Sequence, residues 1–241
     1  MPATTTTKMQ SKRQQMGRNR NKSRRNALRT LRRRDTVGML LFGSCKAGKS
    51  ALVNRWIKGN FHETYEPTIE DFHVKPYRHM GQCANVGIID MTGSGDFAAM
   101  VDLYLAKIDS VLFVYDIGAD TTQTVNDLKR LHELLIKIRG ESYSVSLTVV
   151  GTKVDRNQDR DNYRNTELAD YLKEIDIPEE KHILTSAKLD RNVDEAFESA
   201  LNEVVENMMP SEDSIKRFRK LKNKETSNSW FHKFCCGLSI D

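Results

Sequence analysis

Cysteine is scarce in this 241-residue chain, and long apolar runs and internal repeats are absent. The four cysteines show neither metal-ligand spacing nor a disulfide framework, which favours a reducing compartment. No apolar stretch approaches the roughly 18 residues that a membrane-spanning helix needs, and the Thr-rich, then Lys/Arg-rich start has no apolar signal-peptide core. Repeats of about 20 to 50 residues, which would indicate a solenoid, are not visible. We therefore expect the chain in the cytoplasm or on a cytoplasmic membrane face.

Acidic residues are absent from residues 1–34, which carry twelve Lys and Arg side chains. Residues 211–241 carry seven basic residues against four acidic ones, whereas residues 35–210 hold 19 basic and 29 acidic residues. An acidic body thus lies between two basic arms, although the formal net charge is only +5. This distribution is typical of a chain whose ends meet phosphate-rich surfaces.

Composition divides the chain into three regions. Residues 1–35 are low in complexity and repel themselves electrostatically, so we expect a disordered basic arm with a helix near residues 27–33. Apolar runs alternate with helical periodicity in residues 36–210, which predicts one domain of ordinary size. Residues 211–241 form a basic, aromatic tail that carries a cysteine pair.

The periodicity of the middle region predicts strands that alternate with helices. "VGMLLF" (37–42) reads as a buried strand, and "KSALVNRWIKG" (49–59) reads as a helix that ends at Gly59. We expect a hairpin of strands 71–79 and 84–90 around Met80-Gly81, three further strands at 110–117, 144–151 and 181–186, and helices at 121–140, 165–175 and 193–209. Such alternation implies right-handed crossovers and an α/β fold, with a six-stranded, mostly parallel sheet between helices.

Residues 43–50 read "GSCKAGKS" and connect the first strand of the domain to its first helix. Glycines at both ends of such a loop let the backbone curl around a phosphate tail, while the helix N-terminus adds partial positive charge. In this spacing Lys49 reaches the terminal phosphates and Ser50 coordinates Mg²⁺. A Gly-rich turn without a ligand is the alternative for these eight residues taken alone.

A candidate pocket for the base follows the later strands. "VVGTKVD" (149–155) places Asp155 at the carboxyl end of a strand, where open α/β sheets bind ligands. A carboxylate there can accept from the ring N–H and the exocyclic amine of guanine, which adenine does not offer in that arrangement. "TSAK" (185–188) ends the next strand, and Ala187 can donate its backbone N–H to the carbonyl oxygen of the base. Taken singly, such residues are more often caps or turn residues.

Two further segments, "ETYEPTIEDF" (63–72) and "IIDMTGSGDF" (88–97), supply the remaining candidates. Thr68 can bind Mg²⁺ through its hydroxyl and the terminal phosphate through its amide, and Asp90 can hold a magnesium-bound water. Gly93 can bring its N–H to the same phosphate. Both loops would then be ordered by that phosphate and loosened without it. By itself "TIED" also fits the start of a strand.

Together these motifs resemble the Ras family of small GTPases, over roughly residues 36–209. "GSCKAGKS", "YEPTIED", "DMTG", "GTKVD" and "TSAK" stand at the five motif positions of that family, in its order. The resemblance implies a P-loop small G-protein fold, binding of GTP and GDP with Mg²⁺, and nucleotide exchange driven by a partner. Within the family, "EPTIEDFHVKPY", "FAAM" and "MMPSE" are most similar to the dexamethasone-induced Ras and Rhes branch.

The resemblance also assigns roles residue by residue. Lys49, Gly93 and Ser94 stand at the catalytic positions, and Ser50, Thr68 and Asp90 at the metal positions. The effector loop comprises Tyr65, Glu66, Pro67, Thr68, Ile69, Glu70 and Asp71. The nucleotide-binding positions are Gly43, Ser44, Cys45, Lys46, Ala47, Gly48, Lys49, Ser50, Ala51, Phe61, Thr68, Asp90, Gly93, Thr152, Lys153, Asp155, Ser186, Ala187 and Lys188, with Phe61 and Lys153 packing against the guanine.

Departures from the family pattern bear on hydrolysis. Ser94 stands where the family has the glutamine that orients the attacking water, a task for which its hydroxyl is too short, and Gly95 follows where relatives carry an acid. Cys45 and Lys46 replace two glycines of the loop. Cys45 would crowd the space of the missing glutamine and the route of an activating protein's arginine, whereas Lys46 is expected to point to solvent. We therefore predict tight nucleotide binding, slow hydrolysis and a poor response to ordinary Ras activators.

Thr152 is a departure that bears on exchange. Many relatives have Asn at this position, whose side chain ties the base loop to the phosphate loop. We therefore expect weaker tethering and faster nucleotide exchange here. Fast exchange together with slow hydrolysis would favour the GTP-bound form.

The tails predict attachment to an anionic membrane. Basic residues of the C-terminal tail are interleaved with aromatic ones, and each well-placed basic residue contributes about 1 kcal/mol at such a surface. Leu238 stands where prenylation needs a cysteine, so Cys235 and Cys236 are the candidates for palmitoylation, with two unmodified cysteines as the equal alternative. The ending "CCGLSID" also resembles the Rad/Gem branch, whose members lack prenylation too, although the switch loops here do not resemble theirs. Pro2 excludes myristoylation. The N-terminal arm could target the nucleus, bind RNA or lie on a membrane, and non-specific electrostatic attraction is the favoured interpretation.

We expect a monomeric switch on the cytoplasmic face of the plasma membrane or in the cytoplasm, with a nuclear pool through the N-terminal arm. Its partners would be GTP and GDP, effector proteins, an exchange factor and an activating protein. The alternative is a pseudo-GTPase scaffold that stays largely GTP-bound and recruits partners. A nucleotide kinase built on the same loop is disfavoured, because the sequence has no Arg-rich lid.

Overall fold

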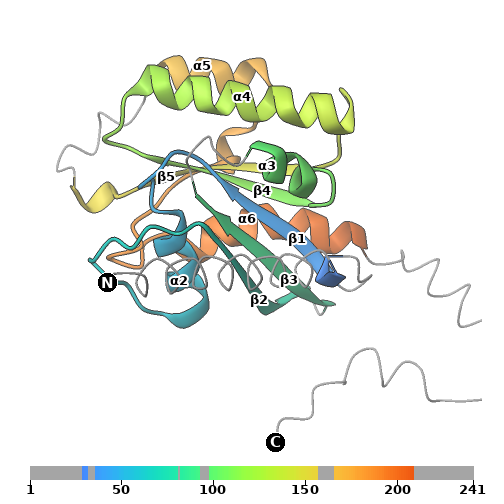
Figure 1. Ribbon diagram of the computed structural model, residues 1–241, viewed down its shortest axis with the longest axis horizontal. Coiled ribbons are helices and arrows are strands. Elements are labelled where there is room, and N and C mark those ends of the chain that lie inside the picture. Colours follow the sequence, from blue (N-terminus) through green and yellow to red (C-terminus); the bar gives the residue numbers. More distant parts are fainter. Residues whose placement is uncertain (1–28, 32–35, 81, 93–97, 157–165, 209–241) are drawn as a thin grey trace, which may run out of the picture.

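Apolar runs and amphipathic segments alternate along the chain, and in the computed structural model they form a layered α/β domain (Figure 1). The structure describes residues 29–31, 36–80, 82–92, 98–156 and 166–208. Most neighbouring strands are parallel, because the segments between them return the chain over the sheet to the edge where it started.

Six strands within the described residues form one sheet in the order β2-β3-β1-β4-β5-β6. In this sheet β2 and β3 pair antiparallel, and the pair His79–Gln82 closes their hairpin around the predicted turn at Met80. The strands are β1 (Thr36–Phe42), β2 (Glu70–His79), β3 (Gln82–Met91), β4 (Ser110–Asp116), β5 (Ser146–Thr152) and β6 (His182–Leu184). The predicted six-stranded, mostly parallel sheet is confirmed.

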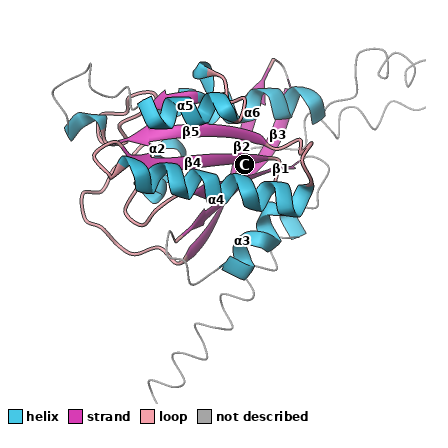
Figure 2. Cartoon of the chain, turned by 90° about the horizontal axis from the view of Figure 1, so that it is seen from above, coloured by secondary structure: helices cyan, strands magenta, loops and turns pink. Residues whose placement is uncertain are grey.

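Helices cover both faces of the sheet, as predicted for a parallel sheet with right-handed crossovers. The helices are α2 (Lys49–Lys58), α3 (Ala98–Leu105), α4 (Thr121–Arg139), α5 (Thr166–Glu174) and α6 (Val193–Met208), with short 3-10 turns η2 (Val154–Arg156) and η3 (Glu179–Lys181). Side chains of α2 and α6 pack on one face and those of α3, α4 and α5 on the other. Figure 2 looks onto the second face, with α4 crossing in front of the strands.

Local capping explains where two helices begin and end. Gly59 adopts a left-handed conformation (φ 66°) and donates its N–H to the carbonyl of Arg55, which terminates α2 at the glycine that the sequence indicated. Asp120 caps α4 by accepting from the N–H of Gln123 at 2.8 Å.

The sequence prediction missed α3 and misjudged several ends. Tyr104 and Leu105 of α3 are fully buried while Leu103 is 38% exposed, but a mostly apolar eight-residue helix gives no clear periodicity. β5 begins two residues later than expected and β6 is limited to three residues, which is the usual uncertainty at element ends. Of the helix predicted near residues 27–33, the structure describes Arg29 to Leu31, where Arg29 and Thr30 are helical.

Strand order places a ligand site at one edge of the sheet. From β1 the chain crosses to β2 on one side and returns as β3 beside β1. It later adds β4, β5 and β6 on the other side, so the direction of winding changes beside β1. The carboxyl ends of β1, β4, β5 and β6 lie together at this edge, which we call the carboxyl edge. In open α/β sheets, ligands bind at such a switch point.

Candidate nucleotide site

The loop from Gly43 to Ser50 joins β1 to α2 at the carboxyl edge. Gly43 has φ 144°, and a Cβ there would lie 1.9 Å from the carbonyl oxygen of Val114, so no side chain fits. Gly48 caps α2 with φ 99° and without a side-chain hydrogen bond. The first helical bond runs from the N–H of Leu52 to Gly48, so the preceding amides have no intrahelical acceptor and can meet an anion.

Lys49 is folded back onto this loop. Its Nζ donates to the carbonyl oxygens of Gly43 at 2.8 Å and Ser44 at 2.7 Å, and the residue is only 6% exposed. Burial lowers the pKa of Lys49, while the nearby Asp90 carboxylate opposes that shift. The ammonium is thus held at the mouth of the loop, where phosphate oxygens would be stronger acceptors than the two carbonyls.

The three predicted metal residues come together beside the loop. The hydroxyls of Ser50 and Thr68 lie 2.8 Å apart, and Asp90, the next-to-last residue of β3, lies beside Ser50 and is 2% exposed. Burial raises the pKa of Asp90, against a hydrogen bond from Ser50 and the charge of Lys49. Asp90 Oδ1 has no partner among the described residues, an arrangement that a metal-bound water would satisfy.

This corner fits Mg²⁺ only in company with phosphates. Among the described residues, no cluster of three His, Cys, Asp or Glu side chains could hold a metal ion by itself. Mg²⁺ commonly takes one or two protein oxygens, several waters and substrate phosphate oxygens. The donor set of two hydroxyls and one carboxylate beside the phosphate loop therefore suits this ion.

A cavity of about 460 Å³ opens next to the loop, at the ends of β5 and β6. Asp155 lies in its wall and accepts a hydrogen bond from the hydroxyl of Ser186 at 2.5 Å, which fixes the carboxylate. The cavity is lined by Gly48, Ala51, Leu52, Phe61, Glu63, Thr152, Lys153, Asp155, Arg156, Ala187 and Lys188. The predicted base-binding residues, far apart in the sequence, thus share one hollow, and Ser186 supports it from behind Asp155.

Thr152 and Lys153 connect this cavity to the phosphate loop. The Thr152 hydroxyl is 2.5 Å from the carbonyl oxygen of Ala47 and 2.9 Å from that of Tyr115. Lys153 Nζ donates to the carbonyl of Lys46 and to Asp116, both at 2.7 Å. Thr152 therefore ties the two loops together through one hydroxyl, and the Lys153 contacts add a tie that the sequence did not indicate.

The predicted effector loop closes over the phosphate loop. Tyr65 lies with its hydroxyl 3.3 Å from Cys45 Sγ, and Lys46 Nζ lies 5.5 Å from the centre of its ring. Lys46 and Cys45 are both exposed, so Lys46 faces solvent as predicted while it covers the ring. The last two residues of this loop, Glu70 and Asp71, begin β2, which is the strand start that the alternative reading of "TIED" indicated.

Sequence reasoning missed a contact on the other side of the loop. Ser44 donates its hydroxyl to Asp127 of α4, and Asp127 also accepts from Gln123 at 2.9 Å. The two partners are 83 positions apart, and no motif marks Asp127. This contact fixes the phosphate loop against α4 and places a carboxylate near Lys49.

Several predicted site residues lie outside the described part of the chain. They are Gly93, Ser94 and Gly95 in the segment after β3, and Cys235 and Cys236 in the C-terminal tail. Their predicted roles stay predictions. No helix in the part of the chain that the structure covers is long and apolar enough to cross a membrane.

The site combines a glycine-bent loop, a buried lysine, two hydroxyls beside a carboxylate, and an adjoining cavity for the base. Together these features define a P-loop nucleotide-binding domain. Residues 38–206 match the Ras family. GTP-binding protein Di-Ras2 of Mus musculus is 32% identical over 189 residues, which cover 77% of this chain and 90% of that protein. GTP-binding protein Rhes of Homo sapiens is 29% identical over 171 residues, which cover 68% of this chain and 63% of that protein. The chain therefore belongs to the Ras family.

It is a Ras-like small GTPase, a GTP-binding molecular switch of the branch that contains Rhes and the Di-Ras proteins, which confirms the predicted resemblance. GTP-binding protein Di-Ras1 of Homo sapiens is also 32% identical, over 68% of this chain and 79% of that protein. Ras-family GTPases generally hydrolyse GTP, bind GTP and GDP with Mg²⁺ and contact effector proteins.

Proposed function

We propose that this GTPase binds guanine nucleotide tightly and hydrolyses GTP slowly. The observation that carries the proposal is the contact between Cys45 and Tyr65 at the mouth of the phosphate loop. Most of the loop is compatible with phosphate binding, but this contact fills the side on which the attacking water and an activating arginine would approach. Ser94 lacks the amide that orients the water in relatives.

The nucleotide is held at both ends by residues of this chain. Backbone amides at the start of α2 and the ammonium of Lys49 bind the phosphates, while Asp155 accepts from the guanine ring. Ser50, Thr68 and Asp90 would hold Mg²⁺, which would neutralise phosphate charge. We assign these roles because all of these residues lie together at the carboxyl edge.

Three features reduce the rate of hydrolysis. The Cys45 side chain occupies space next to the terminal phosphate, the Lys46 and Tyr65 pair covers it, and the Ser94 hydroxyl is shorter than the glutamine amide of relatives. Misplacement of an attacking group by about 1 Å costs on the order of 100-fold in rate. The protein would then stay in its GTP-bound form for longer than a relative with glutamine and glycine at these positions.

Single-turnover hydrolysis of GTP tests the proposal. Ser94→Gln should raise the intrinsic rate by about 10- to 100-fold, because it restores a group that positions water. Cys45→Gly should raise the intrinsic rate by a smaller factor than Ser94→Gln, because it frees space beside the terminal phosphate, and it should restore the response to an activating protein that inserts an arginine. Cys83→Ala is the matched control, since this exposed cysteine lies on β3, away from the loop. A fast wild-type rate that neither substitution changes would refute the proposal.

The basic tails support a proposed location on an anionic membrane at the cytoplasmic face, with effectors bound through Tyr65 to Asp71. Acylation of Cys235 and Cys236 would strengthen that attachment. Vesicle co-sedimentation tests it: binding to phosphatidylserine vesicles should fall steeply with salt and with deletion of residues 211–241. Binding that does not depend on salt or on the tail would contradict an electrostatic anchor.

A further inference from the structure

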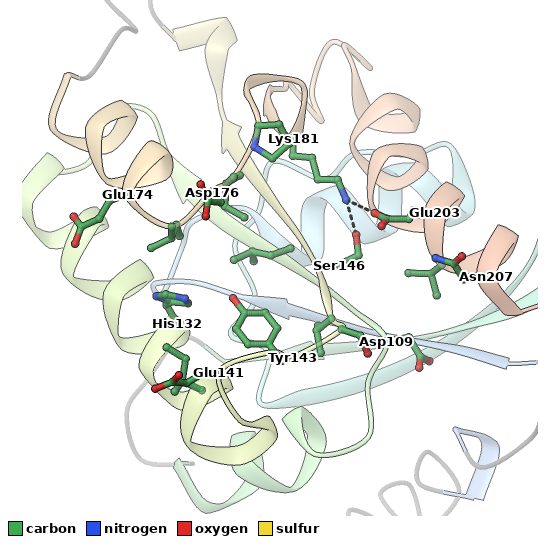
Figure 3. Close-up of a pocket in the computed structure, with 18 of the residues that line it drawn as sticks. Asp109, His132, Glu141, Tyr143, Ser146, Glu174, Asp176, Lys181, Glu203 and Asn207 are labelled. Atoms are coloured by element: carbon green, nitrogen blue, oxygen red, sulfur yellow. Dashed lines mark hydrogen bonds and ion pairs between the residues drawn. The ribbon is translucent and has the colours of Figure 1, made fainter.

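A second and larger cavity lies at the opposite edge of the sheet from the nucleotide. Its volume is about 930 Å³, and it is lined by residues just before β4, β5 and β6 and by the last turns of α5 and α6 (Figure 3). The parallel strands β4, β5 and β6 begin at this side of the sheet and end at the carboxyl edge, so we call this side the amino edge. A ligand in this groove would leave the nucleotide site open.

Acidic groups surround the groove. Its lining contains five carboxylates but a single lysine, Lys181, which pairs with Glu203 at 2.9 Å. Within the described residues, three of these carboxylates have neither a hydrogen bond nor an ion pair, and they line the groove at the ends of α4 and α5 (Figure 3). These three are Glu141, Glu174 and Asp176. An isolated patch of this charge attracts cationic groups.

The groove also offers apolar and aromatic surface. Val145 and Leu147 are buried in its floor, 8% and 3% exposed, and Ile175, Ile177 and Met208 are partly exposed along it. Tyr143 packs against the ring of His132 at 6.0 Å, and aromatic faces of this kind bind Lys and Arg side chains. The groove therefore suits a chain that alternates basic and aromatic residues.

A segment that alternates basic and aromatic residues directly follows the groove in the sequence. Met208, the last residue of α6, lines the groove, and residues 211–241 follow it with seven Lys and Arg residues and four large aromatic ones. We propose that the groove binds residues 211–234 of the same molecule. A tether this short raises the effective concentration of the segment to the millimolar range, so even a weak intrinsic affinity suffices.

The N-terminal arm is the less suitable occupant. It joins the domain near this edge, where Leu31 packs against the core, and it is more basic than the C-terminal tail. It contains no aromatic residue in residues 1–34, however, and therefore cannot use the apolar floor as the tail can.

Binding to the groove would control where the tail can act. Basic and aromatic residues held in the groove are withheld from an anionic surface, and a surface that captures them empties the groove. The domain thus competes with the membrane for one segment, whereas the nucleotide site stays accessible in both states.

Trp230 in the tail provides a direct probe in the full-length, GDP-bound protein. The other tryptophan, Trp56, is 6% exposed and stacks on Phe197 at 4.1 Å, and its contribution is measured with Trp230→Phe. At low salt, acrylamide should quench Trp230 less than it quenches a free peptide of residues 211–234. The double variant Glu141→Lys, Glu174→Lys should weaken docking roughly tenfold and expose Trp230.

A matched double variant distinguishes the groove from overall charge. Glu133→Lys with Glu198→Lys makes the same charge change at exposed positions of α4 and α6 that do not line the groove, and should leave Trp230 protected. Changing Lys216, Arg217, Arg219 and Lys220 to Gln should release the tail without altering any residue of the domain. Retained nucleotide binding verifies that each variant is folded.

Four results would overturn the proposal. They are equal quenching of Trp230 in wild type and groove variant, equal release in both double variants, protection that grows with protein concentration, and protection that appears only after residues 1–28 are deleted. The third would indicate binding between molecules, and the fourth would identify the N-terminal arm as the occupant.

Phosphatidylserine vesicles should expose the groove and bury Trp230 in lipid, whereas neutral phosphatidylcholine vesicles should change nothing.

Discussion

The two edges of the same sheet differ in how their polar and charged groups are held. At the carboxyl edge Lys49, Asp90 and Thr152 are buried, and Lys49 and Thr152 contact backbone carbonyls directly. At the amino edge Glu141 and Glu174 are exposed, with no hydrogen bond or ion pair among the described residues. Buried, oriented groups select one small ligand by geometry, whereas exposed charges of one sign attract an extended segment without fixing its register.

The largest effect should come from the base cavity. Asp155→Ala removes the acceptor for guanine and should weaken GDP binding by at least about 30-fold, since truncating one member of a charge-assisted hydrogen bond costs roughly 2 to 5 kcal/mol. Isothermal titration calorimetry with GDP measures it. Glu141→Ala, which removes a carboxylate from the amino edge, is the control and should leave GDP affinity unchanged. Equal losses in both variants would erase the distinction between the edges.

A smaller effect separates two threonines of β5. Thr152→Val removes the hydroxyl near Ala47 and Tyr115, and should lower the free energy of unfolding by about 1 to 3 kcal/mol and speed GDP release. Thr148→Val is the matched control on the same strand. The Thr148 hydroxyl is buried without a partner among the described residues, so valine there should be neutral or stabilising. Denaturant unfolding compares the two, and a larger loss at Thr148 would contradict the assignment.

The smallest effect concerns pH at the start of β6. His182 accepts from or donates to the Tyr115 hydroxyl at 2.8 Å, and burial lowers its pKa from the ordinary value of 6.5. Below that value the unfolded chain binds a proton that the folded protein resists, so stability should fall as the pH drops through 6.5.

His182→Gln tests this directly, because it removes the titrating group while it keeps a polar side chain. The difference in unfolding free energy between wild type and variant, measured in denaturant from pH 7.5 to 5.5, should shift against the wild type as the pH falls. A difference that does not change with pH would show that His182 titrates alike in both states.

Much of the carboxyl edge could be predicted from the sequence. Gly43, Lys49 and Ser50 belong to one strand-to-helix segment whose backbone needs fixed spacing, and Asp155 follows a strand whose apolar pattern is easily read. The alternation of strands and helices likewise predicted a six-stranded, mostly parallel sheet, whereas the order of its strands came from the structure. Helix α3 could not be predicted, because eight mostly apolar residues show no period.

The sequence by itself determined the class of fold, the phosphate loop and the order of the site residues, because each depends on spacing within a short segment. Tertiary structure alone decided that Asp127 holds Ser44, that Tyr65 reaches Cys45 and that five separate carboxylates surround one groove. Those contacts join positions up to 83 residues apart. Their distances depend on how helices pack against the sheet, which no local pattern of residues encodes.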